Sequence, residues 1–198
     1  MMRKVDAEVA VLFVMEDSYY KSLPGCDCFD ESRDARTYKG TLPVIAHPPC
    51  RTWGKLAHMA TRAAPGEKDL GLFAVAAVRR CGGVVEHPVG SKLFDACGCG
   101  SSDHPDAFGG EVISVDQWDW FHAARKPTLL YIVGTRSLPE FPPRREERPE
   151  RAVGTGHGIR IGSPKFRSRI TDRERMETPL AFALWLVDLA KRCGEVKT

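Results

Sequence analysis

Apolar residues along the chain fall into short, uninterrupted runs that are separated by turn-forming residues. A continuous run of apolar and β-branched side chains is typical of a strand that is buried on both faces. A shorter strand is expected after the Pro-Gly turn within residues 20–30. The longer predicted strands span residues 7–15, 42–46, 83–88 and 128–134.

Two further segments have the pattern of helices. Residues 66–83 carry acidic side chains at the start and arginines before the closing glycines, which suits the helix dipole. Residues 178–194 begin with Thr178 as a cap and Pro179 in the first turn. Strands followed by helices predict an α/β protein with a mostly parallel, Rossmann-like sheet flanked by helices. The length of 198 residues suits a single domain.

Two segments lack apolar periodicity and are predicted to be loops. Residues 95–111 are rich in Gly, Ser, Asp and Cys, and residues 137–169 form a Pro-rich, Gly-rich and charged insertion. The net charge of +3 is too small to indicate a partner, but residues 141–177 hold ten Lys or Arg against six acids. Such a segment can follow phosphates, although a basic run is also typical of a solvated loop. The candidate nucleic-acid contacts are Arg144, Arg145, Arg148, Arg160, Lys165 and Arg167.

Membrane and metal chemistry are not expected. No run approaches the roughly 20 apolar residues of a membrane span, and the N-terminus lacks the features of a signal peptide, so we expect a cytoplasmic protein. Seven cysteines in a reducing compartment need not form disulfides. Two C-x-C pairs, Cys26/Cys28 and Cys97/Cys99, are more closely spaced than the usual C-x₂₋₄-C of zinc sites. Free thiols are therefore favoured over a structural zinc.

Two reactive side chains follow predicted strands. The strand at 42–46 runs into "HPPC", where the two prolines stiffen the chain and hold the Cys50 thiol at the strand's end. Glu86 lies near the end of the strand at 83–88. Because the carboxyl ends of parallel strands open onto one crevice, we expect the thiol and the carboxylate to share a pocket. The alternative interpretation is a buried cysteine and a salt-bridged acid.

A thiolate and a carboxylate in one pocket suit chemistry on a pyrimidine. Addition of a thiolate to C6 makes C5 of the ring nucleophilic, and a carboxyl group at N3 can supply or share the proton that this addition needs. The addition is favoured by a raised pKa for Glu86 and a lowered pKa for Cys50.

The same residues resemble motifs of the C5-cytosine DNA methyltransferases. "HPPC", "VVEHPVG" and a basic pair before "TLLYIVG" follow the order of that family's Pro-Cys, Glu-Asn-Val and arginine motifs, and "SRITDRE" is similar to its late motif. The likeness is closer to small methyltransferase-like proteins of bacteriophages, which share "RDAR", "EHP", "DQ" before "ARK", and a "TP-x-x-FA-x-WL" ending. The resemblance covers most of residues 9–192 and implies a class I methyltransferase-like fold.

The resemblance also implies roles for individual residues. Cys50 would be the nucleophile, Glu86 would hold N3 and the exocyclic amine, and Arg125 would help to orient the base. The substrate-binding residues so implied are His47, Pro49, Trp53, His87 and Lys126. At such positions histidine and tryptophan are more often structural residues. The candidates for binding S-adenosylmethionine are Asp17, Asp30 and Asp34.

Three departures separate this chain from the family pattern. His-Pro follows Glu86 in place of Asn-Val, and the basic pair is out of register with the arginine motif. Between the first strand and Gly25 there is no glycine, although a loop that approaches a cofactor closely normally needs one. Apart from these three departures, the family carries a large recognition domain, and here only residues 135–168 occupy its place. Pyrimidine recognition is therefore better supported than methyl transfer.

The sequence predicts an enzyme that modifies a pyrimidine at C5, with DNA cytosine as the first substrate and S-adenosylmethionine as the first donor. One alternative keeps the cysteine adduct but uses a pyrimidine nucleotide or another one-carbon donor. A second alternative is a catalytically silent relative that binds nucleic acid or a host protein. The missing glycine loop favours this second alternative, while Cys50 and Glu86 oppose it.

Overall fold

The computed structural model describes residues 6–54, 57–61, 63–153 and 168–195. The strands of its main sheet are β1 (Val9–Leu12), β2 (Cys26–Phe29), β3 (Val44–Ala46), β4 (Gly83–Pro88), β5 (Glu111–Asp116) and β6 (Pro127–Val133). The helices are α1 (Glu67–Cys81), α2 (Leu93–Ala96), α3 (Asp172–Met176) and α4 (Leu180–Glu195). Short 3₁₀ turns are η1 (Tyr19–Ser22), η2 (Ala35–Thr37), η3 (Ala57–Met59) and η4 (Gln117–Trp120). A separate ribbon pairs β7 (Arg151–Ala152) with β8 (Ser168–Arg169).

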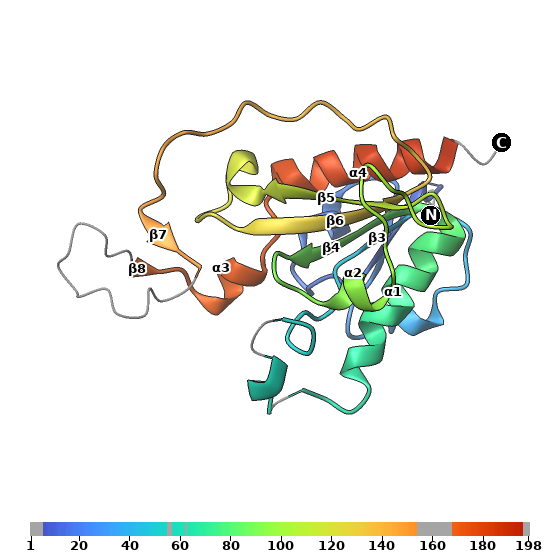
Figure 1. The fold of residues 1–198 in the computed structure, drawn as a ribbon, viewed down its shortest axis with the longest axis horizontal. Coiled ribbons are helices and arrows are strands. Elements are labelled where there is room, and N and C mark those ends of the chain that lie inside the picture. The colour runs from blue at the N-terminus through green and yellow to red at the C-terminus, as the bar shows by residue number, and fades with distance from the viewer. Residues whose placement is uncertain (1–5, 55–56, 62, 154–167, 196–198) are drawn as a thin grey trace, which may run out of the picture.

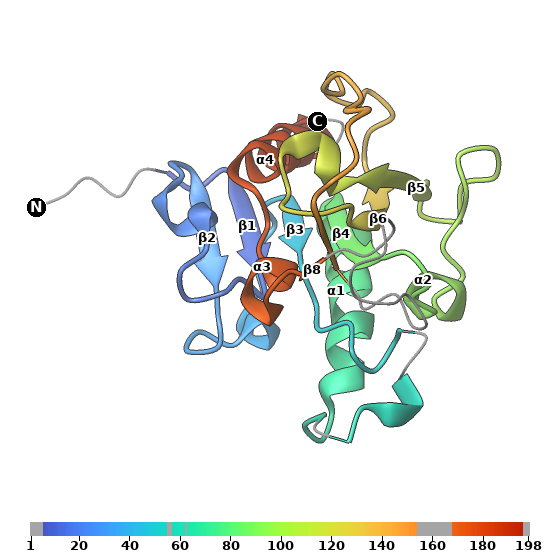
Figure 2. The same ribbon diagram turned by 90° about the vertical axis from the view of Figure 1, so that its left-hand side faces the viewer.

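The main sheet has the strand order β2-β1-β3-β4-β6-β5, which Figure 2 shows from one side to the other. β2, β1, β3 and β4 are parallel, whereas β6 is antiparallel to both of its neighbours. The carboxyl ends of the four parallel strands therefore lie at the same edge of the sheet as the beginning of β6. The predicted α/β class with a mostly parallel sheet is confirmed.

One strand boundary and several short elements differ from the prediction. The first strand ends at Leu12 rather than at residue 15, because Phe13 adopts a left-handed φ of 63°. The helix α2 was not predicted, and its last two residues lie in the segment predicted as loop. The ribbon of β7 and β8 and the helix α3 were not predicted either. β5 was not predicted: it is an edge strand of half-buried residues and has neither a continuous apolar run nor strict alternation.

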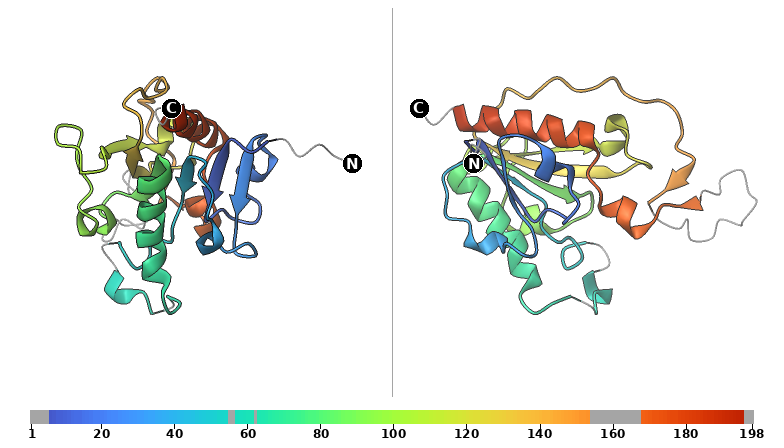
Figure 3. Two further views of the ribbon diagram at one scale, coloured as in Figure 1. Left: turned by 90° about the vertical axis from the view of Figure 1, so that its right-hand side faces the viewer. Right: turned by 180° about the vertical axis from the view of Figure 1, so that it is seen from behind.

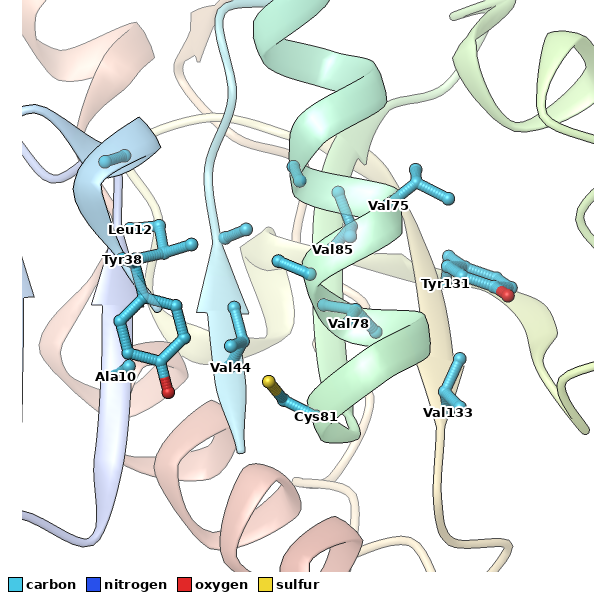
Figure 4. Close-up of a cluster of buried hydrophobic side chains, with 14 of the residues drawn as sticks. Ala10, Leu12, Tyr38, Val44, Val75, Val78, Cys81, Val85, Tyr131 and Val133 are labelled. Carbon is cyan, nitrogen blue, oxygen red and sulfur yellow. The ribbon is translucent and has the colours of Figure 1, made fainter. Parts of the chain in front are cut away.

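Each face of the sheet is covered by one long helix, α1 on one face and α4 on the other (Figure 1). On the α1 face, Val75 and Val78 pack over Val44 of β3 and Val85 of β4 (Figure 4). On the α4 face, Phe182, Leu186 and Leu189 belong to a second buried cluster with residues of β1 and β4. Strands β1, β3 and β4 are thus buried on both sides, as their unbroken apolar runs predict.

The helix boundaries follow the predicted signals closely. α1 begins after Gly66 and ends before Gly82, which has a left-handed φ of 78°. At the start of α4 the carbonyl of Pro179 accepts a hydrogen bond from the amide of Ala183 at 2.9 Å, so the proline stands at the helix boundary. Thr178 precedes it outside the helix.

Gly83 allows β3 and β4 to pair closely. A Cβ atom at this position would lie 2.0 Å from the carbonyl oxygen of Val44, and the residue has a φ of +121°. Its lack of a side chain permits the register Val44–Gly83, Ile45–Val84 and Ala46–Val85. This register sets which residues meet beyond the strand ends.

The segment after β6 returns along the molecule. It passes over the α4 side and reaches β7 near the carboxyl ends of the parallel strands (Figures 1 and 3). There α3 begins with a capping box, in which Thr171 and Glu174 bond each other's backbone amides. Arg151 of β7 holds the Glu174 carboxylate with two hydrogen bonds of 2.6 and 2.7 Å. The predicted insertion thus ends at the edge of the sheet where the reactive side chains lie.

Within the described ranges, no helix combines the length and the apolar character needed to cross a membrane.

Candidate functional site

The loop after β3 carries the nucleophile candidate. The amide of His47 donates to the carbonyl of Leu12 at 3.1 Å, which extends the pairing with β1 by one residue. After Pro48 and Pro49, the carbonyl of Cys50 accepts hydrogen bonds from Trp53 at 3.0 Å and from Gly54 at 2.9 Å, so Cys50 begins a tight turn. Cys50 is exposed.

Glu86 lies beside His47 because of the strand register. Ala46 pairs with Val85, so the next residues along the two parallel strands are His47 and Glu86. His47 Nδ1 lies 3.2 Å from Glu86 Oε2, and the two side chains are only 13% and 11% exposed. The carboxylate therefore sits at the bottom of the loop that carries Cys50, with one edge still reachable from solvent.

A second donor holds the other carboxylate oxygen. Gln117, in η4, is fully buried and donates from Nε2 to Glu86 Oε1 at 3.1 Å and to Thr128 Oγ1 at 3.0 Å. Burial alone would raise the pKa of Glu86. The hydrogen bond from His47 and the positive charge of Lys126 outweigh burial and lower this pKa to about 2. Glu86 is therefore a carboxylate at neutral pH, contrary to the raised pKa expected from the sequence.

The ring of His47 has a second partner in Tyr20, from η1. Its Nε2 lies 3.2 Å from the Tyr20 hydroxyl, which is buried. Burial and the charge of Glu86 raise the pKa of Tyr20, so its phenol keeps its proton. With Glu86 ionised, the network assigns a proton to His47 Nδ1, and the Tyr20 hydroxyl donates to Nε2. The chain of hydrogen bonds from Tyr20 through His47 to Glu86 thus joins η1, the loop after β3 and β4.

Cys50 and Glu86 interact electrostatically. Although Cys50 is exposed, its sulfur is partly desolvated; this desolvation and the negative charge of Glu86 raise the pKa of the thiol. The positive charges of Arg175 and Lys126 act in the opposite direction. The raised pKa differs from the lowered value expected for a nucleophile, so a cation must approach, or the carboxylate must be neutralised, before the thiolate is abundant.

Lys126 is the cation that faces the pair. Burial lowers the pKa of its ammonium group, while the charges of Glu86 and Cys50 raise it. Its Nζ donates to the carbonyl of Glu177 at 3.1 Å, which fixes the side chain beside the segment after α3. The neighbouring Arg125 instead pairs with Asp116 at 3.3 Å and is 45% exposed. The structure therefore brings Lys126, and not Arg125, to the candidate site.

His87 lies beneath the Pro-Pro loop and is buried. Its Nδ1 is 2.6 Å from Ser91 Oγ, which also accepts from the amide of Leu93. Burial lowers the pKa of His87, while the charge of Glu86 and the carbonyls of Pro49 and Pro48 raise it. This arrangement suits a residue that supports the loop carrying Cys50 rather than one that contacts a substrate directly.

Trp53 is part of the core. It is 5% exposed, and its indole Nε1 donates to the carbonyl of Lys68 at 3.1 Å. Its partner lies on α1, so the indole anchors the turn after Cys50 to that helix. Pro49, by contrast, is half-buried. The structure does not place Trp53 where a base would stack on it.

A small cavity lies at the carboxyl end of β1. Its volume is about 170 Å³, and it is lined by Phe13, Val14, Met15, Asp17, Ser18, Tyr19, Tyr20, His47, Arg173, Met176, Glu177 and Thr178. Asp17 forms an ion pair with Arg173 across it. The other two acids predicted to bind a cofactor have local partners: Asp30 pairs with Lys21 at 2.5 Å, and Asp34 caps η2.

The basic candidates that the structure describes have two kinds of surroundings. Arg144 and Arg148 are exposed. Arg145 lies 3.8 Å above the ring of Trp118 and donates to the Trp118 carbonyl at 3.2 Å, so it fastens its segment to η4. The candidates that lie outside the described residues are Arg160, Lys165 and Arg167.

The cysteines of the C-x-C pairs are free thiols. Across the residues that the structure describes, no group of three or more His, Cys, Asp or Glu side chains is placed to hold a metal ion.

Two residues of this site were not singled out from the sequence. Gln117 lies within the "DQ" that precedes the aromatic residues of η4, and that pattern was its only signal. Tyr20 has no motif of its own, and only the packing of η1 against β2 and α4 brings it to His47. Gln117 contacts Glu86 and Tyr20 contacts His47 across long distances in the sequence, so no local sequence motif reveals either residue.

No protein-family model matches the chain, and comparison with curated proteins finds no match either. The case for a function therefore depends on the geometry of the site.

Proposed function

We propose that the protein modifies a pyrimidine base at C5 through a covalent adduct between Cys50 and C6 of the ring. The observation that carries this proposal is that Cys50, in the loop after β3, and Glu86, near the end of the adjacent strand β4, interact electrostatically with each other and with the ammonium of Lys126. A nucleophile, a hydrogen-bonding carboxylate and a cation within interaction range of one another are the groups that this chemistry requires.

The adduct forms and breaks in balanced steps. The Cys50 thiolate adds to C6 while N3 takes up a proton, which leaves a neutral ring with a C4=C5 enamine. C5 then attacks an electrophile. Loss of the proton from C5 expels the thiolate, and N3 returns its proton. The positive charge of Lys126 favours the thiolate before addition.

Glu86 would hold the Watson–Crick edge of the base. Each of its oxygens already accepts one hydrogen bond, from His47 or from Gln117, and a carboxylate has further lone pairs for the exocyclic amine and for a protonated N3. Cytosine offers this pair of donors once N3 is protonated, which makes it the first-choice base.

DNA is the first-choice form of the substrate. The segment after β6 contains the exposed Arg144 and Arg148 and then reaches β7, near the edge of the sheet at which Cys50 lies. A duplex substrate would have to present a flipped base, whereas a free pyrimidine nucleotide would not. The C5-labelling experiment described below can use either DNA or a free pyrimidine nucleotide as the substrate.

S-adenosylmethionine is the donor that the family resemblance implies, and the cavity after β1 and the three acids predicted to bind it do not fit it in their present arrangement. The cavity after β1 has a volume of about 170 Å³, below the roughly 300–1,000 Å³ of most small-molecule sites. Asp17 is occupied by Arg173, and Asp30 and Asp34 are engaged in their own loops. The electrophile is therefore proposed by class, as a one-carbon donor, and calorimetric titration with S-adenosylmethionine tests the first candidate.

Hydrogen exchange at C5 tests the adduct without any donor. In deuterium oxide the enamine takes up a deuteron at C5, and elimination then leaves deuterated cytosine, which mass spectrometry detects. We expect the wild-type protein to label cytosine in DNA or in deoxycytidine monophosphate, and Cys50→Ser to abolish the labelling. Labelling that persists in Cys50→Ser, or no labelling of either substrate by the wild type, would overturn the proposal.

A second candidate is a catalytically silent domain that binds nucleic acid. The small, ion-paired cavity after β1 favours it, because a silent domain needs no donor site. It predicts that DNA binds without C5 labelling and that Cys50→Ser binds DNA as the wild type does.

A further inference from the structure

Glu86 is surrounded by donors. His47 Nδ1 donates to one oxygen and Gln117 Nε2 to the other, at 3.2 and 3.1 Å. The hydrogen bond from His47 and the positive charge of Lys126 outweigh burial and keep the pKa of Glu86 below its usual range. The free site therefore holds Glu86 ionised, and an ionised carboxylate only accepts hydrogen bonds.

Because Glu86 is ionised in the free site, the proposed reaction needs another source for the proton that N3 takes up. Addition of the thiolate to C6 of cytosine needs a proton at N3, which is an acceptor in the neutral base. Glu86 has no proton of its own to give. The proton must come from a group in contact with Glu86.

The titratable groups around Glu86 come from four elements. His47 and Cys50 lie in the loop after β3, Tyr20 in η1, Lys126 before β6, and His87 on β4 itself. Cys50 must lose a proton rather than supply one. Lys126 is bonded to the carbonyl of Glu177, and its charge is needed by the thiolate.

His47 is different because its two nitrogens connect Glu86 to a second proton donor. Nδ1 faces Glu86 and Nε2 faces the Tyr20 hydroxyl, each at 3.2 Å. Both residues also line the cavity at the end of β1, and the ring of His47 is partly exposed, so water can reach this chain.

We propose that Tyr20 and His47 form a proton relay that supplies N3 of the base through Glu86. The inference rests on the proposed function, and it assigns to both residues a positioning and proton-delivering role behind the carboxylate. As N3 takes a proton from Glu86, Nδ1 of His47 gives its proton to the carboxylate, and the Tyr20 hydroxyl gives its own to Nε2. A water on the cavity side gives a proton to the Tyr20 oxygen in the same step and becomes hydroxide, so no phenolate accumulates, and elimination runs the chain in reverse and restores the water.

Tyr20→Phe is the sharpest test, because it removes one hydroxyl and keeps the ring. We expect C5 labelling of cytosine in deuterium oxide to slow by about 10²-fold, the low end of the effect of a positioned acid or base. The rate at which iodoacetamide alkylates Cys50 should not change, because that reaction needs no proton at N3. His47→Gln, which keeps an amide donor for Glu86 but cannot pass on a proton, should slow labelling at least as much.

The pH profile separates a relay from a structural effect. Without the relay, N3 draws its proton from solution, so the ratio of wild-type to Tyr20→Phe labelling rates should grow as the pH rises. A ratio that stays constant with pH, or an equal loss of alkylation, would overturn the relay while leaving the adduct in place. Absence of labelling in the wild type would instead reject the proposed function, and the relay with it.

Discussion

Glu86 raises the pKa of Cys50 across the gap between two adjacent strand ends. Glu86→Gln removes this charge, so the pKa of the thiol should fall and alkylation of Cys50 by iodoacetamide at pH 7 should become faster. Pyrimidine labelling should be lost at the same time, because the base loses its partner. Slower alkylation in Glu86→Gln would mean that the two groups are not coupled as described.

Lys126 should act on Cys50 in the opposite direction. Lys126→Met removes a positive charge that lowers the pKa of the thiol, so alkylation at a fixed pH should slow and its pH profile should move to higher pH. Arg125→Met is the matched control: it removes the neighbouring charge, which pairs with Asp116 at the surface. Equal effects of the two substitutions would contradict the placement of Lys126.

The ionisation of Glu86 should also contribute to stability. Its pKa of about 2 in the folded protein lies below the ordinary value of 4.5, so the stabilisation is present above pH 4.5 and is lost as the pH falls toward 2. Within that window the free energy of unfolding should fall by about 1 kcal/mol per pH unit from this residue. Urea unfolding at pH 5 and pH 3 measures it, and Glu86→Gln should lack this component.

The exposed arginines of the segment before β7 should contribute to DNA binding. If Arg144 and Arg148 each contact one phosphate, the double substitution to Ala should reduce the slope of log K against log salt by about 1.8. Arg145→Ala should instead lower the melting temperature, because its guanidinium packs on Trp118. A gel-shift series in salt distinguishes the two, and an unchanged slope in the double variant would remove these arginines from the interface.

The elements that could be predicted from the sequence are those whose signal is local. The apolar runs of β1, β3, β4 and β6 and the glycine-bounded α1 were recognisable because burial on both faces leaves little choice of residue. β5 was missed since an edge strand with half-buried residues has no such constraint. The antiparallel direction of β6 depends on the path of the chain through β5 and η4, which no local pattern encodes.

In the candidate site, the positions of Cys50 and Glu86 were predictable from the sequence, but the residues around them were not. Cys50 follows β3 and Glu86 lies near the end of β4, so their proximity could be inferred from parallel pairing. Their protonation could not, because it depends on the partners of His47, Gln117 and Lys126, which come from three separate segments. Trp53 lies in the core, the more common position for a tryptophan, but an aromatic residue near a nucleophile has the same appearance in the sequence whether it points inward or outward.

The tight approach of β4 to Val44 at Gly83 means that the main chain itself sets the spacing between sulfur and carboxylate. The segment before β7, to which the proposed function assigns contacts with DNA, is joined to this frame at other points. It could therefore be exchanged without altering that spacing, whereas a side chain at position 83 would disturb it from the opposite end of β4.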